Sequence, residues 1–164
     1  MTQYSSLITH YSPSAWAALV ALAGLTACAA AGEHHHEHKP PHGGAPIVFG
    51  DGLAHLELVL DAKEGKLTAY VLDAELQRAV RVKQKEIELR VRPGDGKSEA
   101  VVKLRAVGSV LTGESEGDTS QFEGQDAGLK GLARFAGTIA ALTVRGKEFK
   151  DVEFRFPEGN EAAR

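Results

Sequence analysis

Apolar and polar residues alternate along most of the chain from Ile47 onward. In 55–60, leucine occupies every second position (Leu56, Leu58 and Leu60), and a period of two predicts a strand with one buried face. No segment keeps a helical period of 3.6 residues. The pattern predicts one all-β domain over 47–158, an antiparallel β-sandwich or small barrel of about seven or eight strands. Similar alternation, separated by turn-forming residues, recurs in 67–72, 80–83, 87–92, 102–106, 135–144 and 148–156, with a short strand around Phe122.

Two polar positions of the first of these strands carry side chains that bind metals. Successive side chains of a strand point to opposite faces, so His55 and Glu57 lie together if the leucines face the core. One metal ion can contact two side chains that are one pleat apart, and both residues are therefore candidate ligands. The alternative is an exposed histidine and glutamate on a strand edge, without a ligand role.

The segment before the β domain differs in composition. No Asp, Glu, Lys or Arg precedes Glu33, and an apolar run covers 15–24. This run is shorter than the roughly 20 apolar residues that span a bilayer, and it fits the hydrophobic region of a signal peptide. It is followed by Leu25-Thr26-Ala27-Cys28, which resembles the lipobox of bacterial lipoproteins. A buried apolar helix with an incidental cysteine is the alternative.

The lipobox resemblance implies cleavage before Cys28 and attachment of lipid to its sulfur. It therefore predicts a signal peptide over 1–27, followed by a lipid anchor and flexible tether over 28–46. The first residues depart from the pattern because they contain no Lys or Arg. Ala29 rather than Asp follows the cysteine, which by Gram-negative sorting rules favours the outer membrane. We expect a protein of the cell envelope, anchored in a membrane and facing the periplasm or the cell exterior.

Histidines are concentrated in the predicted tether, where five of the chain's seven lie within 34–42. A tract with Pro40-Pro41 and Gly43-Gly44 does not pack a core. Clustered neutral imidazoles bind divalent Zn, Ni, Co or Cu, whereas Cu(I) prefers sulfur ligands. The alternative is a solvated spacer that binds no metal. The candidate metal ligands are His34, His35, His36, His38 and His42, together with His55 and Glu57.

Composition and motif spacing argue against several other classes of function. The chain has 164 residues, is 43% apolar and carries a formal net charge of −3, which argues against an electrostatic nucleic-acid binder. A single cysteine excludes an internal disulfide framework. The sequence has no zincin, nucleophile-elbow or P-loop spacing, and the acid-rich stretch 114–126 does not match an EF-hand. We therefore do not predict an enzyme.

Four motifs occur early in the β domain and just before it: Pro41-His42-Gly43-Gly44, Phe49-Gly50-Asp51, His55-Leu56-Glu57-Leu58-Val59 and the run 65–73. They resemble a small β module of uncharacterised bacterial lipoproteins, and a similar run precedes some periplasmic adaptor subunits of heavy-metal efflux systems. The resemblance implies periplasmic handling of a divalent metal. After Phe156 there is no room for the α-helical hairpin and barrel domains of an adaptor, so we expect either a free-standing metal-binding relative or a reuse of the same fold for another function.

Two functions are consistent with these features. The first is an envelope lipoprotein that binds a divalent transition metal for buffering, delivery or efflux support, with a metal-efflux or other envelope protein as its partner. The second is a lipid-anchored β-sandwich that binds another protein and has no metal role. The first predicts metal binding that is lost at low pH, because a protonated imidazole cannot coordinate a metal ion.

Overall fold

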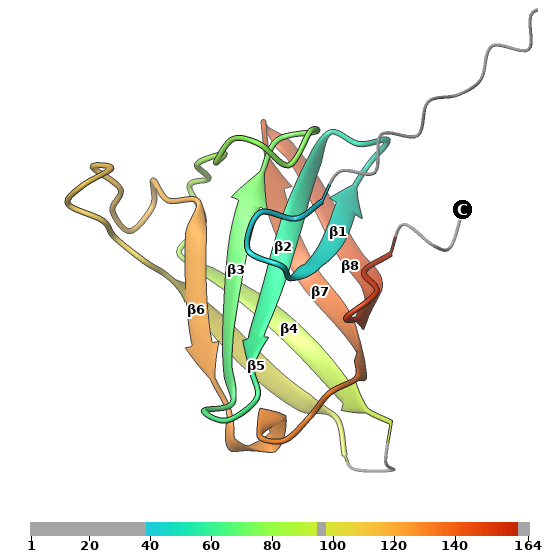
Figure 1. Cartoon of the computed structure of the whole chain (residues 1–164). Coiled ribbons are helices and arrows are strands. Elements are labelled where there is room, and N and C mark those ends of the chain that lie inside the picture. Colours follow the sequence, from blue (N-terminus) through green and yellow to red (C-terminus); the bar gives the residue numbers. More distant parts are fainter. Residues whose placement is uncertain (1–38, 95–97, 161–164) are drawn as a thin grey trace, which may run out of the picture. The chain divides into compact units, whose positions relative to one another are not determined.

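The computed structural model describes residues 39–94 and 98–160, which form an all-β structure. Its antiparallel sheet has the strand order β1-β2-β3-β6-β5-β4-β7-β8 and curls into a nearly closed barrel (Figure 1). The predicted fold class is confirmed, and of the two predicted architectures the chain adopts the barrel. The elements are β1 (Ala45–Phe49), β2 (Ala54–Asp61), β3 (Lys66–Leu72), β4 (Glu86–Pro93), β5 (Ala100–Ala106), β6 (Gln121–Gln125), the 3-10 helix η1 (Ala127–Leu129), β7 (Phe135–Val144) and β8 (Lys147–Phe156).

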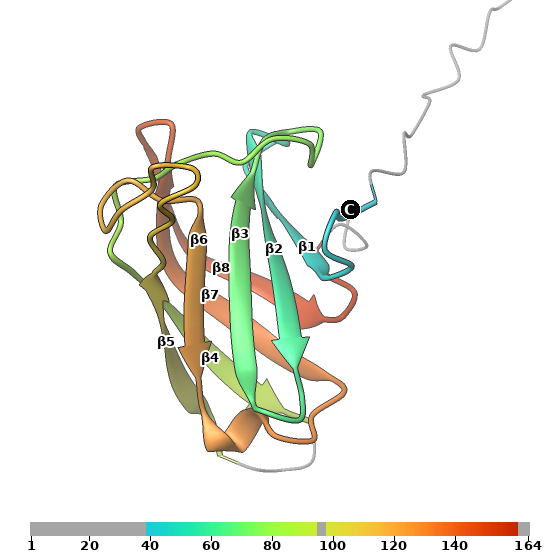
Figure 2. The same cartoon turned by 60° about the vertical axis from the view of Figure 1, so that its left-hand side comes forward.

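The apolar residues of the alternating strands fill the barrel interior. Leu56 and Leu58 of β2 are fully buried, as their period of two predicts. Figure 2 shows β6, β3 and β2 side by side, with β4 and β7 crossing behind them. Each strand contributes to one apolar cluster, whose members include Ile47, Leu56, Leu67, Leu89, Leu104, Phe122, Ile139 and Phe154.

β7 and β8 form the hairpin that the sequence predicts at 145–147. Arg145 and Gly146 at its turn have φ values of 50° and 78°, the left-handed conformation that suits a tight two-residue hairpin. Further along the hairpin, Phe154 pairs with Gly137. A Cβ at Gly137 would lie 2.4 Å from the Phe154 ring, so the glycine provides the space in which this ring packs.

The first and last strands approach each other where the barrel closes. The N–H of Val48 donates to Asn160 Oδ1 (2.7 Å), and Asn160 Nδ2 donates to the Val48 carbonyl oxygen (3.2 Å). Gly159 fits against Pro46, because a Cβ at Gly159 would lie 1.9 Å from the Pro46 carbonyl oxygen. The Asn160 amide thus gives β1 the hydrogen bonds that a neighbouring strand would otherwise provide.

One predicted strand does not form a ladder. Val82 is buried and Val80 packs against the core, as their alternation predicts. However, the segment between β3 and β4 makes only isolated bridges to its neighbours. The Asp73 carboxylate accepts hydrogen bonds from the backbone N–H groups of Gln77 and Arg78, and these bonds turn the chain directly after β3. The apolar alternation therefore marks a loop that packs on the core, rather than a strand.

The folded structure includes the last part of the predicted tether. β1 begins at Ala45, two residues before the predicted boundary at Ile47. The segment 39–44 ahead of it crosses the outer face of β2, as the blue ribbon in Figure 1 shows. Within 39–94 and 98–160 there is no helix that is long and apolar enough to cross a membrane.

Candidate functional site

Some of the predicted ligands lie within the described part of the chain. His55 and Glu57 occupy the face of β2 opposite its buried leucines, as predicted. Neither residue is exposed, since their relative accessibilities are 4% and 0%, and the alternative of an exposed pair is therefore wrong. His42 lies in the segment that crosses β2. Outside the described residues are the predicted lipidation site and four further ligands, namely Cys28, His34, His35, His36 and His38.

The crossing segment engages both carboxylate oxygens of Glu57. Oε1 accepts hydrogen bonds from the backbone N–H groups of His42 (2.7 Å) and Gly44 (2.9 Å). Oε2 lies 2.7 Å from Nδ1 of the His42 ring. The two N–H groups flank Gly43, which has a φ of 70°, and this arrangement forms a small anion-binding concavity. Glu57 thus has the polar partners that a buried carboxylate requires.

The two glycines after His42 make this crossing possible. Gly43 adopts the left-handed conformation that other residues rarely adopt. A Cβ at Gly44 would lie 2.6 Å from the Leu58 carbonyl oxygen and 2.9 Å from Glu57 Cγ. A larger residue at this position would separate the segment from β2, so the His-Gly-Gly sequence has a structural explanation.

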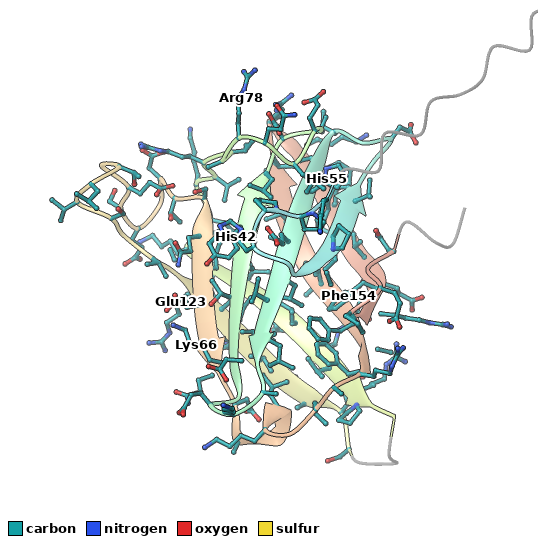
Figure 3. The ribbon with its side chains drawn as sticks, viewed as in Figure 1. His42, His55, Lys66, Arg78, Glu123 and Phe154 are labelled. Carbon is teal, nitrogen blue, oxygen red and sulfur yellow. The ribbon has the colours of Figure 1, made fainter. Side chains whose placement is uncertain are left out.

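The His42 ring is held in one orientation on the barrel surface. It stacks on Tyr70, with ring centroids 3.7 Å apart and an interplanar angle of 9°. Tyr70 lies opposite Glu57 in the β2–β3 ladder. The residue that stacks on the His42 ring and the residue that hydrogen-bonds to it are therefore neighbours in the sheet. Figure 3 shows His42 over β2 and β3, apart from His55 near one end of the barrel. The His42 side chain remains 41% exposed, and no described residue is a partner of its Nε2.

Charged residues surround Tyr70 on the same face. Lys66 Nζ lies 2.8 Å from Glu123 Oε2, and this hydrogen bond raises the pKa of Lys66. Burial raises the pKa of the Tyr70 phenol, and the carboxylates of Glu123 and Glu57 raise it further. Tyr70 therefore supports the His42 ring as a neutral phenol near neutral pH.

His55 belongs to a different local structure. Its Nδ1 lies 3.0 Å from the carbonyl oxygen of Asp73, where the chain leaves β3. Burial alone would raise the pKa of Asp73, but backbone hydrogen bonds from Gln77 and Arg78 and the Arg78 charge outweigh it. The pKa of Asp73 consequently lies below its ordinary value. His55 thus packs against the turn that Asp73 organises.

The described residues do not form a complete metal site by themselves. In 39–94 and 98–160, no group of three or more His, Cys, Asp or Glu side chains is placed to hold an ion. The geometry gives no support to an ion shared by His55 and Glu57, because both Glu57 oxygens contact the crossing segment. The site instead offers one imidazole, that of His42, in a fixed orientation. His42 follows His38, the nearest of the other predicted ligands, by four residues.

Tyr70 belongs to the site but is not among the predicted site residues, although the pairing of β2 with β3 could have identified it. A tight turn at 62–65 sets the β2–β3 register, and this register places Tyr70 opposite Glu57. No feature of the sequence predicts the contact between His42 and Glu57. Residues 40–44 have no periodic pattern, and their Pro and Gly content is also typical of a tether.

The acid-rich stretch contains a carboxylate that organises its own loop. Glu114 Oε1 accepts a hydrogen bond from the Ser120 N–H (2.9 Å), and Oε2 accepts one from Thr112 Oγ1 (2.7 Å). Burial would raise the pKa of Glu114, but the bonds from Ser120 and Thr112 and the nearby Arg81 charge hold it below its ordinary value. This carboxylate therefore has a structural role in the loop before β6.

Comparison with known proteins adds no assignment. No protein-family model, no curated protein sequence and no solved structure matches this chain. The resemblance of 41–83 to the β module of bacterial lipoproteins stays a prediction.

Proposed function

We propose that this chain is a membrane-anchored envelope lipoprotein that binds a divalent transition metal through its histidine tract and His42. The metal is Zn²⁺, Ni²⁺, Co²⁺ or Cu²⁺, and binding serves buffering, delivery or efflux support. Lipid at Cys28 attaches the chain to the membrane, where a metal-efflux or other envelope protein is its partner. The proposed role is binding rather than catalysis.

The observation that carries this proposal is the fixed and partly exposed ring of His42. Glu57 and Tyr70 hold the ring, and 41% of the side chain remains accessible. Side chains that must be brought together around an ion lose conformational entropy on binding. A ligand that is already held in place reduces that cost, because fewer groups must be ordered on binding. The other proposed ligands are His34, His35, His36 and His38.

Calorimetric titration of the full chain in detergent solution with Zn²⁺ tests the proposal. The test variant carries four substitutions, His34→Gln, His35→Gln, His36→Gln and His38→Gln. Glutamine keeps a polar side chain but removes the imidazole ligand. We expect the wild-type chain to bind Zn²⁺ with micromolar or better affinity. The variant should bind on the order of tenfold more weakly or worse, a loss of about 1.4 kcal/mol or more.

His55→Gln is the matched control, since it removes an imidazole that lies outside the tract and contacts Asp73. It should leave the zinc affinity close to that of the wild-type chain once circular dichroism has shown that the variant is folded. Equal zinc affinity of the tract variant and the wild-type chain would contradict the proposal.

A different observation favours the second candidate function, a lipid-anchored protein-interaction module without a metal role. Val110 and Leu111 in the loop between β5 and β6 have relative accessibilities of 101% and 99%. Adjacent apolar side chains that are fully exposed are common in contact surfaces. If the wild-type chain does not bind Zn²⁺, Ni²⁺ or Cu²⁺ in the titration, this function is the better account.

A further inference from the structure

We infer that Glu57 is a positioning residue: it holds His42 in the Nδ1–H tautomer and thereby leaves Nε2 as the ring nitrogen that binds a metal ion. The metal part of this inference rests on the proposed function. It assigns to Glu57 a role that differs from direct coordination, and it identifies the atom of His42 that acts as the ligand.

The position of the ring proton follows from the contacts of the carboxylate. The backbone N–H groups of His42 and Gly44 can only donate, so Oε1 of Glu57 is an acceptor for both. An ionised carboxylate accepts at both oxygens. Oε2, at 2.7 Å from Nδ1, is therefore an acceptor as well, and Nδ1 carries the hydrogen. A neutral imidazole has one N–H, so Nε2 keeps its lone pair.

The surroundings of the ring prevent the opposite orientation. A half-turn of the His42 ring would place carbon Cδ2, instead of Nδ1, next to the Glu57 carboxylate, and the short hydrogen bond would be lost. The backbone of His42 is held by the same carboxylate, and stacking on Tyr70 at 3.7 Å fixes the plane of the ring. Nδ1 is therefore the ring nitrogen that faces Glu57, and Nε2 is left as the ligand atom.

This arrangement matches the general chemistry of metal-binding histidines. Such a histidine usually donates its second ring N–H to a carboxylate or a carbonyl, which fixes the tautomer and makes the ligand more basic. Removing the partner typically weakens metal binding by roughly 10- to 100-fold. Glu57 and His42 have this geometry, and the carboxylate therefore orients the ring nitrogen that would bind the ion.

Glu57→Gln separates the positioning role from the structural role of this side chain. The amide oxygen of glutamine can still accept hydrogen bonds from the N–H groups of His42 and Gly44. The amide NH₂ then faces Nδ1 and donates to it. The crossing segment should stay in place, while His42 changes to the Nε2–H tautomer and loses its ligand atom.

Glu123→Gln is the matched control. Glu123 lies on the same face of the barrel and pairs with Lys66, but it has no hydrogen bond or ion pair with His42. The substitution removes one carboxylate near Tyr70 in the same way, and it should leave the tautomer of His42 unchanged.

The measurement is nitrogen-15 NMR of the His42 ring in the full chain in detergent solution, free of metal and at pH 8.5, where imidazoles are largely neutral. We expect the Nδ1–H tautomer in the wild-type chain and in Glu123→Gln, and the Nε2–H tautomer in Glu57→Gln. On addition of Zn²⁺, the His42 signals should shift in the first two proteins. Glu57→Gln should bind Zn²⁺ roughly 10- to 100-fold more weakly.

A wild-type ring in the Nε2–H form, or in a mixture of both tautomers, would overturn the inference, and this result does not depend on whether a variant folds. Unchanged zinc affinity in Glu57→Gln, despite an inverted tautomer, would also overturn it. If the wild-type ring has the expected tautomer but the chain binds no Zn²⁺, the proposed function fails, and with it the metal role of Nε2.

Discussion

Glu57 lies on the outer face of β2, where strand alternation predicts a solvated side chain, yet its relative accessibility is 0%. A carboxylate that leaves water needs hydrogen-bond donors. The N–H groups of His42 and Gly44 lie outside the sheet ladder and need acceptors. Each group meets the requirement of the other, and the crossing segment consequently packs on the barrel.

Gly44→Ala tests how closely the crossing segment must approach β2. The new Cβ would lie 2.6 Å from the Leu58 carbonyl oxygen, which is backbone and cannot move aside easily. We expect the free energy of unfolding, measured with urea, to fall by about 1–3 kcal/mol. Gly94→Ala is the control, because a Cβ at Gly94 would have no atom within 4 Å. Equal losses in the two variants would show that the close approach at Gly44 contributes nothing to stability.

The sequence predicts only part of this site, for a physical reason. The alternating leucines of β2 determine which face carries His55 and Glu57, so their placement on one face could be predicted. Their burial depends on what covers that face, and the two residues have different covers: His55 packs against the turn after β3, whereas the segment 39–44 covers Glu57. That segment has no periodic pattern, and nothing in the sequence connects it to a glutamate 13 to 15 positions away.

At the scale of the elements, the strands with one buried face were predicted well. β7 (Phe135–Val144) has the predicted bounds, β2 is one residue longer than predicted at each end, and β3 begins one residue earlier than predicted. The order β3-β6-β5-β4 was not predictable, because alternation shows which side chains face inward and not which strands are neighbours. Val80 and Val82 illustrate the same limit, since a loop that packs on the core has the same alternation as a strand.

The loop before β6 depends on a charged Glu114, and its stability should therefore depend on pH. The folded pKa of Glu114 lies below the ordinary value of 4.5. Its contribution is thus complete above pH 4.5 and is lost as the pH falls through the lower folded pKa. Compared with the wild-type chain, Glu114→Gln should be less stable by about 1–3 kcal/mol at pH 7, with a smaller difference near pH 3.

Urea unfolding at both pH values measures this effect. Glu116→Gln is the control, because Glu116 forms a surface ion pair with Lys85 and its side chain is 63% exposed. Surface pairs of this kind contribute little to stability. A difference between wild-type and Glu114→Gln that stays constant from pH 7 to pH 3 would show that the charge of Glu114 is not the cause.

At the scale of the whole molecule, the sheet must protect its two ends. β1 and β8 are the end strands of the order β1-β2-β3-β6-β5-β4-β7-β8, and an exposed strand edge can pair with another chain. Asn160 follows β8 and bonds both backbone groups of Val48. The edge of β1 is therefore covered by a side chain, and barrel closure depends on an amide rather than on a further ladder.

Asn160→Ala should open this closure. The variant loses two hydrogen bonds to Val48, and we expect the free energy of unfolding to fall by about 1–3 kcal/mol. The Val48 N–H should exchange faster with deuterium, while amides of the β7–β8 ladder keep their exchange rates. Asn160→Asp is the matched variant, because its carboxylate still accepts from the Val48 N–H but cannot donate to the Val48 carbonyl. It should protect this amide while restoring only part of the stability. If Val48 exchanges at the wild-type rate in Asn160→Ala, contacts other than this amide, such as that of Gly159 with Pro46, are sufficient to close the barrel.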